Sequence, residues 1–493
     1  MRDRDKRITN REFDQRVNRL ANALLLKGII KGETVGLLMP NSYEMPEIFF
    51  AAARIGAVSV PVNIRLSPRE ITYILNNAEV KILFLGSSFF EVIDRIKTEL
   101  PLIRDYVLTG RHSEKGLTGY EDFLAEGSIL PPEIRLDDED TVFIIYTAGT
   151  TGKPKGAELT HKNMVLNALT IHLESFSALP RRADLPVLPS KIISITPFFH
   201  IAGIVSVVKN ILTSTPMIII DFDPVVLLGA IEQEKATYLF LVPAMWQMVM
   251  NHPDFKNYDV SSLRTAAYGA DITPNALKER ILEHFPNAAL YEAFGQTEMT
   301  ATAVCMKHQD ALRKEGSVGQ PFFNVEVRVV DDQMKDVGVH EVGEIVYRGP
   351  GLFKGYYKNP EETRKAFEGG WFHSGDLVRR DEEGFIYVVD RKKDMIVSGG
   401  ENIYSAEVEA VLLIHPKIKE AAVIGIPDPK WGETVKAFVV CTSGQEATAE
   451  EIITFCMDHL ARFKRPKVVE FIASLPRSAT GKVLKRELRS INN

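Results

Sequence analysis

Short apolar runs alternate with helical stretches between residues 34 and 242, and this alternation limits the fold more than any other feature of the chain. The runs read TVGLLMP, AVSVPV, VKILFLG, TVFIIY, KIISIT, PMIIID and TYLFLV. Before them, Thr9 and Glu12 have the spacing of a capping box, which predicts a helix from about residue 10. Strands that are apolar throughout are typical of sheets covered on both faces. The sequence therefore predicts an α/β architecture with largely buried sheets.

The pattern changes from about residue 320, where short strands are separated by Gly and Asp turns. VEVRVVDD, GEIVYRGP and GFIYVVDRKKDMIVSGG have this character and predict a β-rich, antiparallel subdomain. After Arg391, AEVEAVLLIHP and AEEIITFCMDHLA are helical, while EAAVIGIPD and VKAFVVCT are extended. We expect a large N-terminal domain over residues 1–390 and a small α+β C-terminal domain over 391–493, with the boundary at residues 390–394.

The bulk composition excludes several classes of protein. The net charge of -6 is small for 493 residues, which argues against a nucleic-acid partner. The 3 cysteines lie far apart without a C-x-x-C pair, so we expect no zinc site or disulfide framework, and a reducing cytoplasm fits best. No apolar run approaches the roughly 18 residues of a transmembrane helix. Peripheral membrane contact through a lipid-like substrate stays open, as does a homodimer.

The loop YTAGTTGKPKG, residues 146–156, follows the apolar run TVFIIY and has the chemistry of a phosphate-binding loop. Its glycines let backbone N–H groups approach an anion, while its threonines and lysines add donors and charge. The spacing excludes a Walker loop, because Gly149 and Gly152 are too close together and Pro154 follows Lys153. The alternative is a plain strand-to-helix turn, which rarely carries so many donors.

Three further stretches carry candidate chemistry. YEAFGQTEMT presents Thr297 beside Glu298, an arrangement that suits Mg²⁺ shared with a triphosphate. WFHSGDLVRRDEEGFIYVVDRKKD presents Asp376 and Arg391, which suit ribose hydroxyls. LPRSATGKVLKREL places Lys482 after a turn and just before a helix, where its ammonium could reach an oxyanion. Taken singly, the first two are better explained as a helix N-terminus and a surface turn.

Together, and in this order, the four stretches resemble the adenylate-forming superfamily of acyl-CoA synthetases, firefly luciferase and peptide-synthetase adenylation domains. The resemblance runs from about Ile8 to Arg489. It implies a large N-terminal domain and a small mobile C-terminal domain, with the active site between them. It also implies ATP and coenzyme A as co-substrates, Mg²⁺ as the metal, and activation of a carboxylic acid as acyl-AMP with release of pyrophosphate.

The resemblance also implies roles for individual residues. The ATP-binding residues would be Thr147, Gly149, Thr150, Thr151, Gly152, Lys153 and Lys155 around the phosphates, Gly269, Ala270, Asp271 and Phe294 at the adenine, and Asp376 and Arg391 at the ribose. The catalytic residues would be Lys482 between the carboxylate and the α-phosphate, Thr297 at the phosphates, Glu298 on Mg²⁺, and His200 as a gate to the carboxylate. Lys393 matches the hinge, and Gly399 and Gly400 match the loop that lines the thiol tunnel.

The acyl pocket in this family lies around the stretch PFFHIAG, which here predicts a mostly apolar lining of His200, Ile201, Gly203, Val207, Tyr268 and Gly295. We therefore expect a medium- or long-chain fatty acid as substrate. The alternatives are an aryl acid, a dicarboxylic acid of the 2-succinylbenzoate type, and a homologue that binds ligand without turnover. Lys209 would read a second carboxylate only if it points inward, and we expect it to point outward. Free coenzyme A is the expected thiol, because the chain ends soon after Lys482.

Two departures from the family pattern stand out. Ala148 replaces the usual serine of the phosphate loop, so restoring serine should alter ATP affinity modestly and leave acid preference alone. The chain also begins almost at its first helix, and we expect no leader strand before it.

Overall fold

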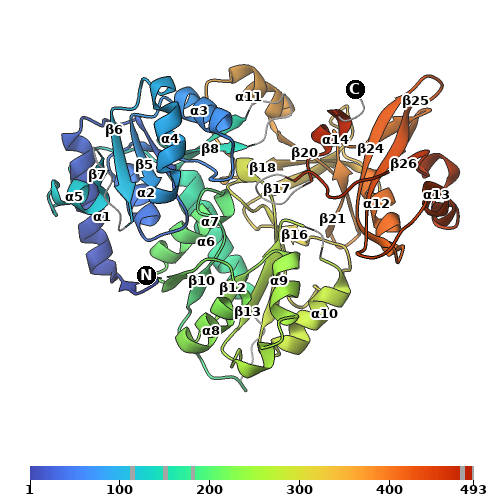
Figure 1. Cartoon of the computed structure of the whole chain (residues 1–493), viewed down its shortest axis with the longest axis horizontal. Helices are drawn as coiled ribbons and strands as arrows, with labels where there is room; N and C mark the ends of the chain where they lie inside the picture. The colour runs from blue at the N-terminus through green and yellow to red at the C-terminus, as the bar shows by residue number, and fades with distance from the viewer. Residues whose placement is uncertain (111–116, 148–153, 179–183, 272, 478–482, 491–493) are drawn as a thin grey trace. The chain divides into compact units, whose positions relative to one another are not determined.

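The computed structural model describes residues 1–110, 117–147, 154–178, 184–271, 273–477 and 483–490 (Figure 1). Its contacts divide the chain into two compact units, the first containing Met1–Val327 and Tyr347–Phe372, and the second containing Arg328–Val346 and His373–Asn493. The two units are defined by the contacts within each of them. The hinge expected at residues 390–394 describes a rotation of the C-terminal domain, so it stays a prediction.

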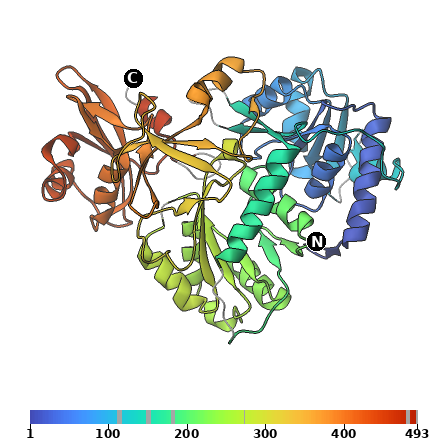
Figure 2. The same cartoon turned by 180° about the vertical axis from the view of Figure 1, so that it is seen from behind.

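An eight-stranded sheet, ordered β19-β9-β8-β4-β3-β5-β6-β7, lies in the first unit (Figures 1 and 2). Its strands are β3 (Thr34–Leu38), β4 (Val58–Pro61), β5 (Ile82–Gly86), β6 (Asp105–Thr109), β7 (Thr118–Gly119), β8 (Thr141–Thr147), β9 (Lys155–Thr160) and β19 (Gly355–Tyr356). The strands from β8 to β7 are parallel, while β9 and β19 are added antiparallel. The accompanying helices are α1 (Asn10–Leu26), α2 (Glu44–Arg54), α3 (Pro68–Asn77), α4 (Phe90–Ile96) and α5 (Tyr120–Ala125).

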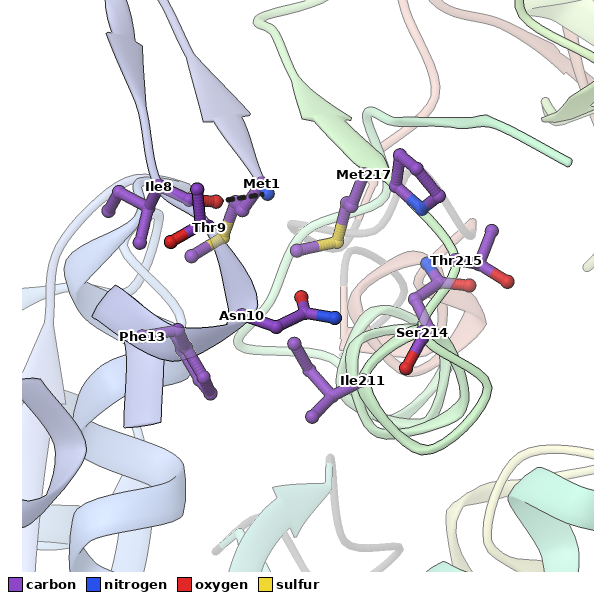
Figure 3. Close-up of a pocket in the computed structure, with 11 residues that line it drawn as sticks. Met1, Ile8, Thr9, Asn10, Phe13, Ile211, Ser214, Thr215 and Met217 are labelled. Carbon is purple, nitrogen blue, oxygen red and sulfur yellow. Dashed lines mark hydrogen bonds between the residues drawn. The ribbon is translucent and has the colours of Figure 1, made fainter. Parts of the chain in front are cut away.

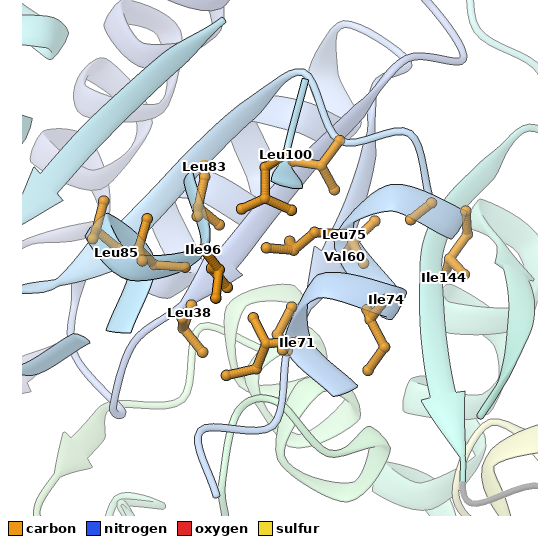
Figure 4. Close-up of a cluster of buried hydrophobic side chains, with 14 of the residues drawn as sticks. Leu38, Val60, Ile71, Ile74, Leu75, Leu83, Leu85, Ile96, Leu100 and Ile144 are labelled. Carbon is orange, nitrogen blue, oxygen red and sulfur yellow. The ribbon is translucent and has the colours of Figure 1, made fainter. Parts of the chain in front are cut away.

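The core of this sheet forms where α3 and α4 cover the strands (Figure 4). Ile71, Ile74 and Leu75 from α3 meet Leu83 and Leu85 from β5, and all five are almost fully buried. The predicted helix start is confirmed at α1, where Thr9 and Glu12 form both hydrogen bonds of a capping box.

A nine-stranded sheet, ordered β16-β15-β14-β13-β12-β10-β11-β1-β2, is the second layer of the first unit. Its strands are β1 (Arg2–Asp3), β2 (Lys6–Arg7), β10 (Ile192–Ser194), β11 (Met217–Ile219), β12 (Tyr238–Phe240), β13 (Thr265–Gly269), β14 (Ala289–Phe294), β15 (Val304–Met306) and β16 (Gln320–Pro321). The helices around it are α6 (His161–Ser177), α7 (Ile201–Leu212), α8 (Pro224–Glu234), α9 (Pro243–Met250) and α10 (Asn275–His284). Each of the seven apolar runs identified in the sequence contains a strand of one of these two sheets.

The N-terminal residues correct one expectation. Arg2 and Asp3 form β1, which pairs parallel with β11, and β1 turns back through a hairpin onto β2. A short strand pair therefore precedes the first helix and extends the sheet edge. The sequence missed it because strands of two charged residues carry no apolar pattern.

Among the described residues, the second unit combines two sheets with three helices. Strands β17 (Glu326–Val330), β18 (Gly343–Arg348), β20 (Phe372–Arg380) and β21 (Ile386–Arg391) form a four-stranded sheet, most of it in this unit. The other sheet contains β22 (Ile396–Ser398), β23 (Glu401–Ile403), β24 (Ile418–Asp428), β25 (Gly432–Cys441) and β26 (Val468–Phe471). Its helices are α12 (Ser405–Ile414), α13 (Ala449–Met457) and α14 (Lys485–Ser490). The predicted fold class, a large α/β domain with a β-rich part and a small α+β domain, is confirmed.

Within the described ranges, no helix combines the length and apolarity needed to cross a membrane.

Candidate active site

The phosphate loop is described only at its two ends. Thr147 is the last residue of β8 and Lys155 is the first of β9. Six residues between them, Ala148, Gly149, Thr150, Thr151, Gly152 and Lys153, lie outside the described residues. The Lys155 ammonium forms an ion pair with Glu362 of α11 (Pro360–Ala366) and lies 5.3 Å from the ring centroid of Tyr356. The Lys155 hydrogen bond is also the largest cause of a lowered pKa at Glu362.

The predicted metal carboxylate belongs to the same cluster. Glu298 lies in the short 3₁₀ turn η4 (Thr297–Met299), and its backbone carbonyl accepts a hydrogen bond from Phe353 N–H at 2.8 Å. The Tyr356 hydroxyl donates to Glu298 Oε1 at 2.9 Å. Because Tyr356 contacts both Lys155 and Glu298, β19 joins the predicted phosphate loop to the predicted metal ligand.

Sequence reasoning missed Tyr356 and Glu362. Asn359 accepts a hydrogen bond from the Glu362 N–H at 3.2 Å, and this spacing is a readable helix-start signal. That signal predicts where α11 begins, but it gives no sign that Glu362 reaches back to Lys155.

The donor set around Glu298 fits a Mg²⁺ ion that arrives with a polyphosphate. Among the described residues, no group of three or more His, Cys, Asp or Glu side chains could hold a metal ion by itself. Mg²⁺ is usually bound through one or two carboxylates, with phosphate and water completing its octahedron. A single carboxylate with one oxygen fixed by Tyr356 matches that requirement.

The residues predicted to bind adenine lie at the carboxyl ends of two neighbouring strands of the nine-stranded sheet. Gly269 ends β13 and Phe294 ends the neighbouring parallel strand β14. A Cβ on Gly269 would lie 2.4 Å from the Ala293 carbonyl oxygen, so only glycine permits this approach of the two strands. Ala270 continues with a positive φ of 69° and Asp271 is exposed. The carboxyl ends of parallel strands are the usual place for ligands in such sheets.

The two predicted ribose residues contact each other within the second unit. Asp376 on β20 is paired with Arg391 on β21, and Arg391 Nε lies 2.8 Å from Asp376 Oδ1. The Arg391 guanidinium also donates to the Ser374 carbonyl at 3.2 Å. Asp376 is only 6% exposed, so the strand register and this ion pair fix its orientation.

The predicted hinge is followed by a firmly anchored helix. Asp390 accepts hydrogen bonds from Ser405 Oγ at 2.7 Å and from the Ala406 N–H at 3.4 Å, which ties it to the first turn of α12. Burial lowers the pKa of Lys393. The Asp390 carboxylate therefore connects the end of β21 to the start of α12.

Gly399 and Gly400 form the two-residue turn between β22 and β23, with φ values of 61° and 86°. Positive φ at both positions is the requirement of a type I′ hairpin turn. The Gly399 N–H donates to the Trp431 carbonyl at 2.7 Å, and a Cβ on Gly399 would lie 2.7 Å from the Trp431 ring.

The predicted acyl residues cluster at the start of α7. His200 is its N-cap, and the Ala202 N–H donates to His200 Nδ1 at 3.4 Å. Ile201 and Val207 are buried on the same helix. Gly203 lets the first turn approach the chain, because a Cβ there would lie 2.2 Å from the Pro197 carbonyl oxygen. Gly295 is equally crowded, with the Ala301 carbonyl oxygen 2.5 Å from its hypothetical Cβ.

One side-chain expectation needs correction. The outward orientation predicted for Lys209 is wrong, since Lys209 is only 6% exposed and its Nζ lies 4.5 Å from the Tyr238 ring centroid. The ring of Tyr268 is fully buried with its centroid 5.8 Å from the Lys278 ammonium of α10, and its place in the acyl pocket stays a prediction.

Lys482 lies outside the described residues, so its predicted role stays a prediction. The helix predicted after it is present as α14.

A cavity of about 260 Å³ lies apart from the predicted site residues (Figure 3). It opens between the N-terminal segment, where Met1 N donates to the Ile8 carbonyl at 2.8 Å, and the C-terminal end of α7 with the turn that follows it. Asn210 lines this cavity, while its neighbour Lys209 does not.

The cluster of Lys155, Tyr356 and Glu298 suits an enzyme that binds Mg²⁺ together with a nucleotide polyphosphate. The chain belongs to the AMP-binding enzyme family, within its AMP-forming acid–CoA ligases: the family model matches residues 1–357, and that of the AMP-binding enzyme C-terminal domain matches 407–482.

The alignments with known relatives cover almost the whole chain. A feruloyl-CoA synthase of an Amycolatopsis species is 37% identical and aligns with 98% of this chain and 93% of its own. A long-chain-fatty-acid–CoA ligase of Mycobacterium tuberculosis is 35% identical, with the same two coverages of 98% and 93%. The o-succinylbenzoate CoA synthetase of Bacillus subtilis, solved with its acyl-adenylate intermediate, is 28% identical with a TM-score of 0.85, covering 99% of this chain and 94% of that one. The same ligase has also been solved with ATP and a magnesium ion.

Proposed function

We propose that this ATP-dependent acid–CoA ligase activates a carboxylic acid with an apolar body as acyl-AMP and then transfers the acyl group to free coenzyme A. The observation that carries the proposal is the cluster in which Tyr356 contacts both Lys155 and Glu298. It puts a cation, a hydroxyl and a single carboxylate together, which are the groups that a Mg²⁺-polyphosphate requires.

In this proposal the first unit binds the phosphates and the acid. Lys155, Thr147 and the loop between them bind the phosphates together with Thr297. Glu298 binds Mg²⁺. Mg²⁺ would offset the negative charge that gathers around the α-phosphorus when the carboxylate attacks it. Gly269 to Asp271 and Phe294 lie at the sheet edge where the adenine would bind, and His200 lies at the mouth of the acyl site.

The second unit supplies the remaining groups in this proposal. Asp376 accepts from the ribose hydroxyls and Arg391 holds that carboxylate in place through its 2.8 Å ion pair. Lys482 neutralises the reacting carboxylate and the α-phosphate during adenylation. Lys393 marks the hinge, and the turn at Gly399 and Gly400 contributes to the coenzyme A path in the second half-reaction.

A medium- or long-chain fatty acid is the first substrate candidate and an aryl acid the second. Both match the apolar side chains of Ile201 and Val207, and the relatives named above include ligases for a feruloyl and for a long-chain fatty acyl group. We also propose a cytoplasmic location, which the free state of all 3 cysteines supports.

The test is acid-dependent ATP–pyrophosphate exchange with fatty, aryl and dicarboxylic acids, followed by thioester formation with coenzyme A. We expect exchange with at least one acid, a loss of exchange in Glu298→Gln, and a loss in Lys482→Ala. Exchange without thioester would point to another acyl acceptor. An enzyme that supports exchange with no acid in the panel would overturn the proposal.

A further inference from the structure

Helix α14 begins three residues after Lys482 and carries two basic side chains that reach other parts of the second unit. Lys485 and Arg489 are four residues apart, which puts them on one face of the helix. Leu488 is fully buried in an apolar cluster with side chains of β24 and β25. The helix is therefore held by an apolar anchor and by two charged links.

The first link joins Lys485 to α12 in a largely buried contact. The Lys485 Nζ lies 2.7 Å from Glu409 Oε1 and donates to Ser405 Oγ at 2.6 Å. The Lys485 and Glu409 side chains are 15% and 20% exposed, and Ser405 is fully buried. Burial raises the pKa of Glu409, and the Lys485 charge opposes that rise. Glu409 also accepts from the Val423 N–H at 2.7 Å, so the contact connects α14, α12 and β24.

The second link joins Arg489 to the chain at the predicted hinge residue Lys393. The Arg489 guanidinium donates to Asp394 Oδ1 at 3.0 Å and to the Lys393 carbonyl at 3.4 Å. Arg489 and Asp394 are 95 positions apart in the sequence. This contact therefore connects the helix that follows Lys482 directly to the hinge, without the intervening strands and helices.

The chain on either side of the Lys482 loop is paired at its base. Val483, the residue after Lys482, forms an antiparallel bridge with Arg477. The Leu484 N–H donates to the Pro476 carbonyl at 2.8 Å. Because α14 begins at the next residue, a displacement of this helix also displaces the base of the loop.

A domain that rotates about a hinge brings a lysine accurately to a reacting group only if the path from the hinge to that lysine is stiff. A misplacement of about 1 Å can cost about 100-fold in rate. We propose that Lys485 and Arg489 are positioning residues, which fix α14 to α12 and to the hinge so that Lys482 reaches the reacting carboxylate during adenylation. This inference rests on the proposed acid–CoA ligase function.

The test measures the two half-reactions separately, with an acid that the wild type accepts. Adenylation is followed by ATP–pyrophosphate exchange, and the second step by thioester formation from purified acyl-AMP and coenzyme A. We expect Lys485→Met to lower the kcat of exchange at least about tenfold, with both KM values and thioester formation within about threefold of wild type. Lys485→Arg should recover part of the loss, because it restores a cation beside Glu409.

Two more variants on α14 complete the comparison. Arg489→Gln breaks the more exposed of the two links, with side chains 38% and 13% exposed, and should cause the same selective loss even if Lys485→Met fails to fold. The control is Arg486→Gln, which replaces an exposed arginine on the same helix and should change neither half-reaction.

A double variant shows whether Lys485 acts through Lys482. In the Lys482→Ala background, Lys485→Met should change single-turnover acyl-AMP formation by less than about twofold, because the group that it positions is gone. A further tenfold loss in that background would overturn the inference, as would unchanged exchange or equal losses in both half-reactions of the single variants. Exchange with no acid in the wild type would instead overturn the proposed function, and this inference with it.

Discussion

Replacing Lys209 by methionine should stabilise the free protein, because the folded state holds this ammonium away from water. The pKa falls from 10.5 to about 8 on folding, a difference of about 2.5 units. At about 1.4 kcal/mol per unit, the charge costs about 3 kcal/mol of folding free energy. Methionine keeps a long apolar stem in the same space without the charge.

The pH dependence follows from the direction of the shift. The folded pKa of Lys209 lies below the unfolded value, so between pH 8 and 10.5 the unfolded chain binds more protons than the folded one. Stability of the wild type therefore rises with pH across this window, and the full cost is present below pH 8. The advantage of Lys209→Met should shrink from about 3 kcal/mol at pH 7 to about 1 kcal/mol at pH 10.

The neighbouring groups leave this window to Lys209. Burial lowers the pKa of His172 and raises that of Tyr238, so the first titrates below the window and the second above it. Urea denaturation of wild type and Lys209→Met at pH 7 and pH 10 measures the effect, with Lys256→Met, which replaces an exposed lysine in the turn Phe255–Asn257, as the control. The reasoning is refuted if Lys209→Met is no more stable than wild type at pH 7, or if its advantage is the same at both pH values.

Three further predictions concern the predicted active site. Tyr356→Phe removes the hydroxyl that donates to Glu298, and the loss of about 1 kcal/mol should raise the KM for Mg²⁺-ATP about fivefold in the exchange assay. An unchanged KM would count against a role of this cluster in binding Mg²⁺-ATP. Gly399→Ala places a Cβ against the Trp431 ring at positive φ, and thioester formation should fall at least about tenfold while exchange persists; equal losses in both would contradict a role in the thiol step. Asp376→Asn should weaken ATP binding about tenfold and leave the KM for the acid unchanged, as measured by titration with ATP alone.

Local patterns predicted seven strands of the two large sheets and the start of the first helix. All seven apolar runs contain strands, and the capping pair Thr9 and Glu12 marks the start of α1, because such signals depend only on near neighbours. The contact between Lys155 and Glu362 joins residues 207 positions apart. It exists because β19 adds to β9 in one antiparallel register, and two residues of β19 carry too little pattern to reveal that pairing.

The orientation of Lys209 could not be predicted for a related reason. An amphipathic helix reveals its inner face through the contrast with a polar face, and in α7 the polar residues Ser206, Lys209 and Asn210 share one face, yet Lys209 and Asn210 are both buried. From the sequence, a lysine in such a helix is expected to point into solvent, because an exposed ammonium loses no hydration. What overrides this expectation is the packing of α7 against the sheet, which leaves Lys209 only 6% exposed and puts its ammonium 4.5 Å from the ring centroid of Tyr238 on β12. The sequence contains both Lys209 and Tyr238, and only the contact between α7 and β12 shows that they face each other.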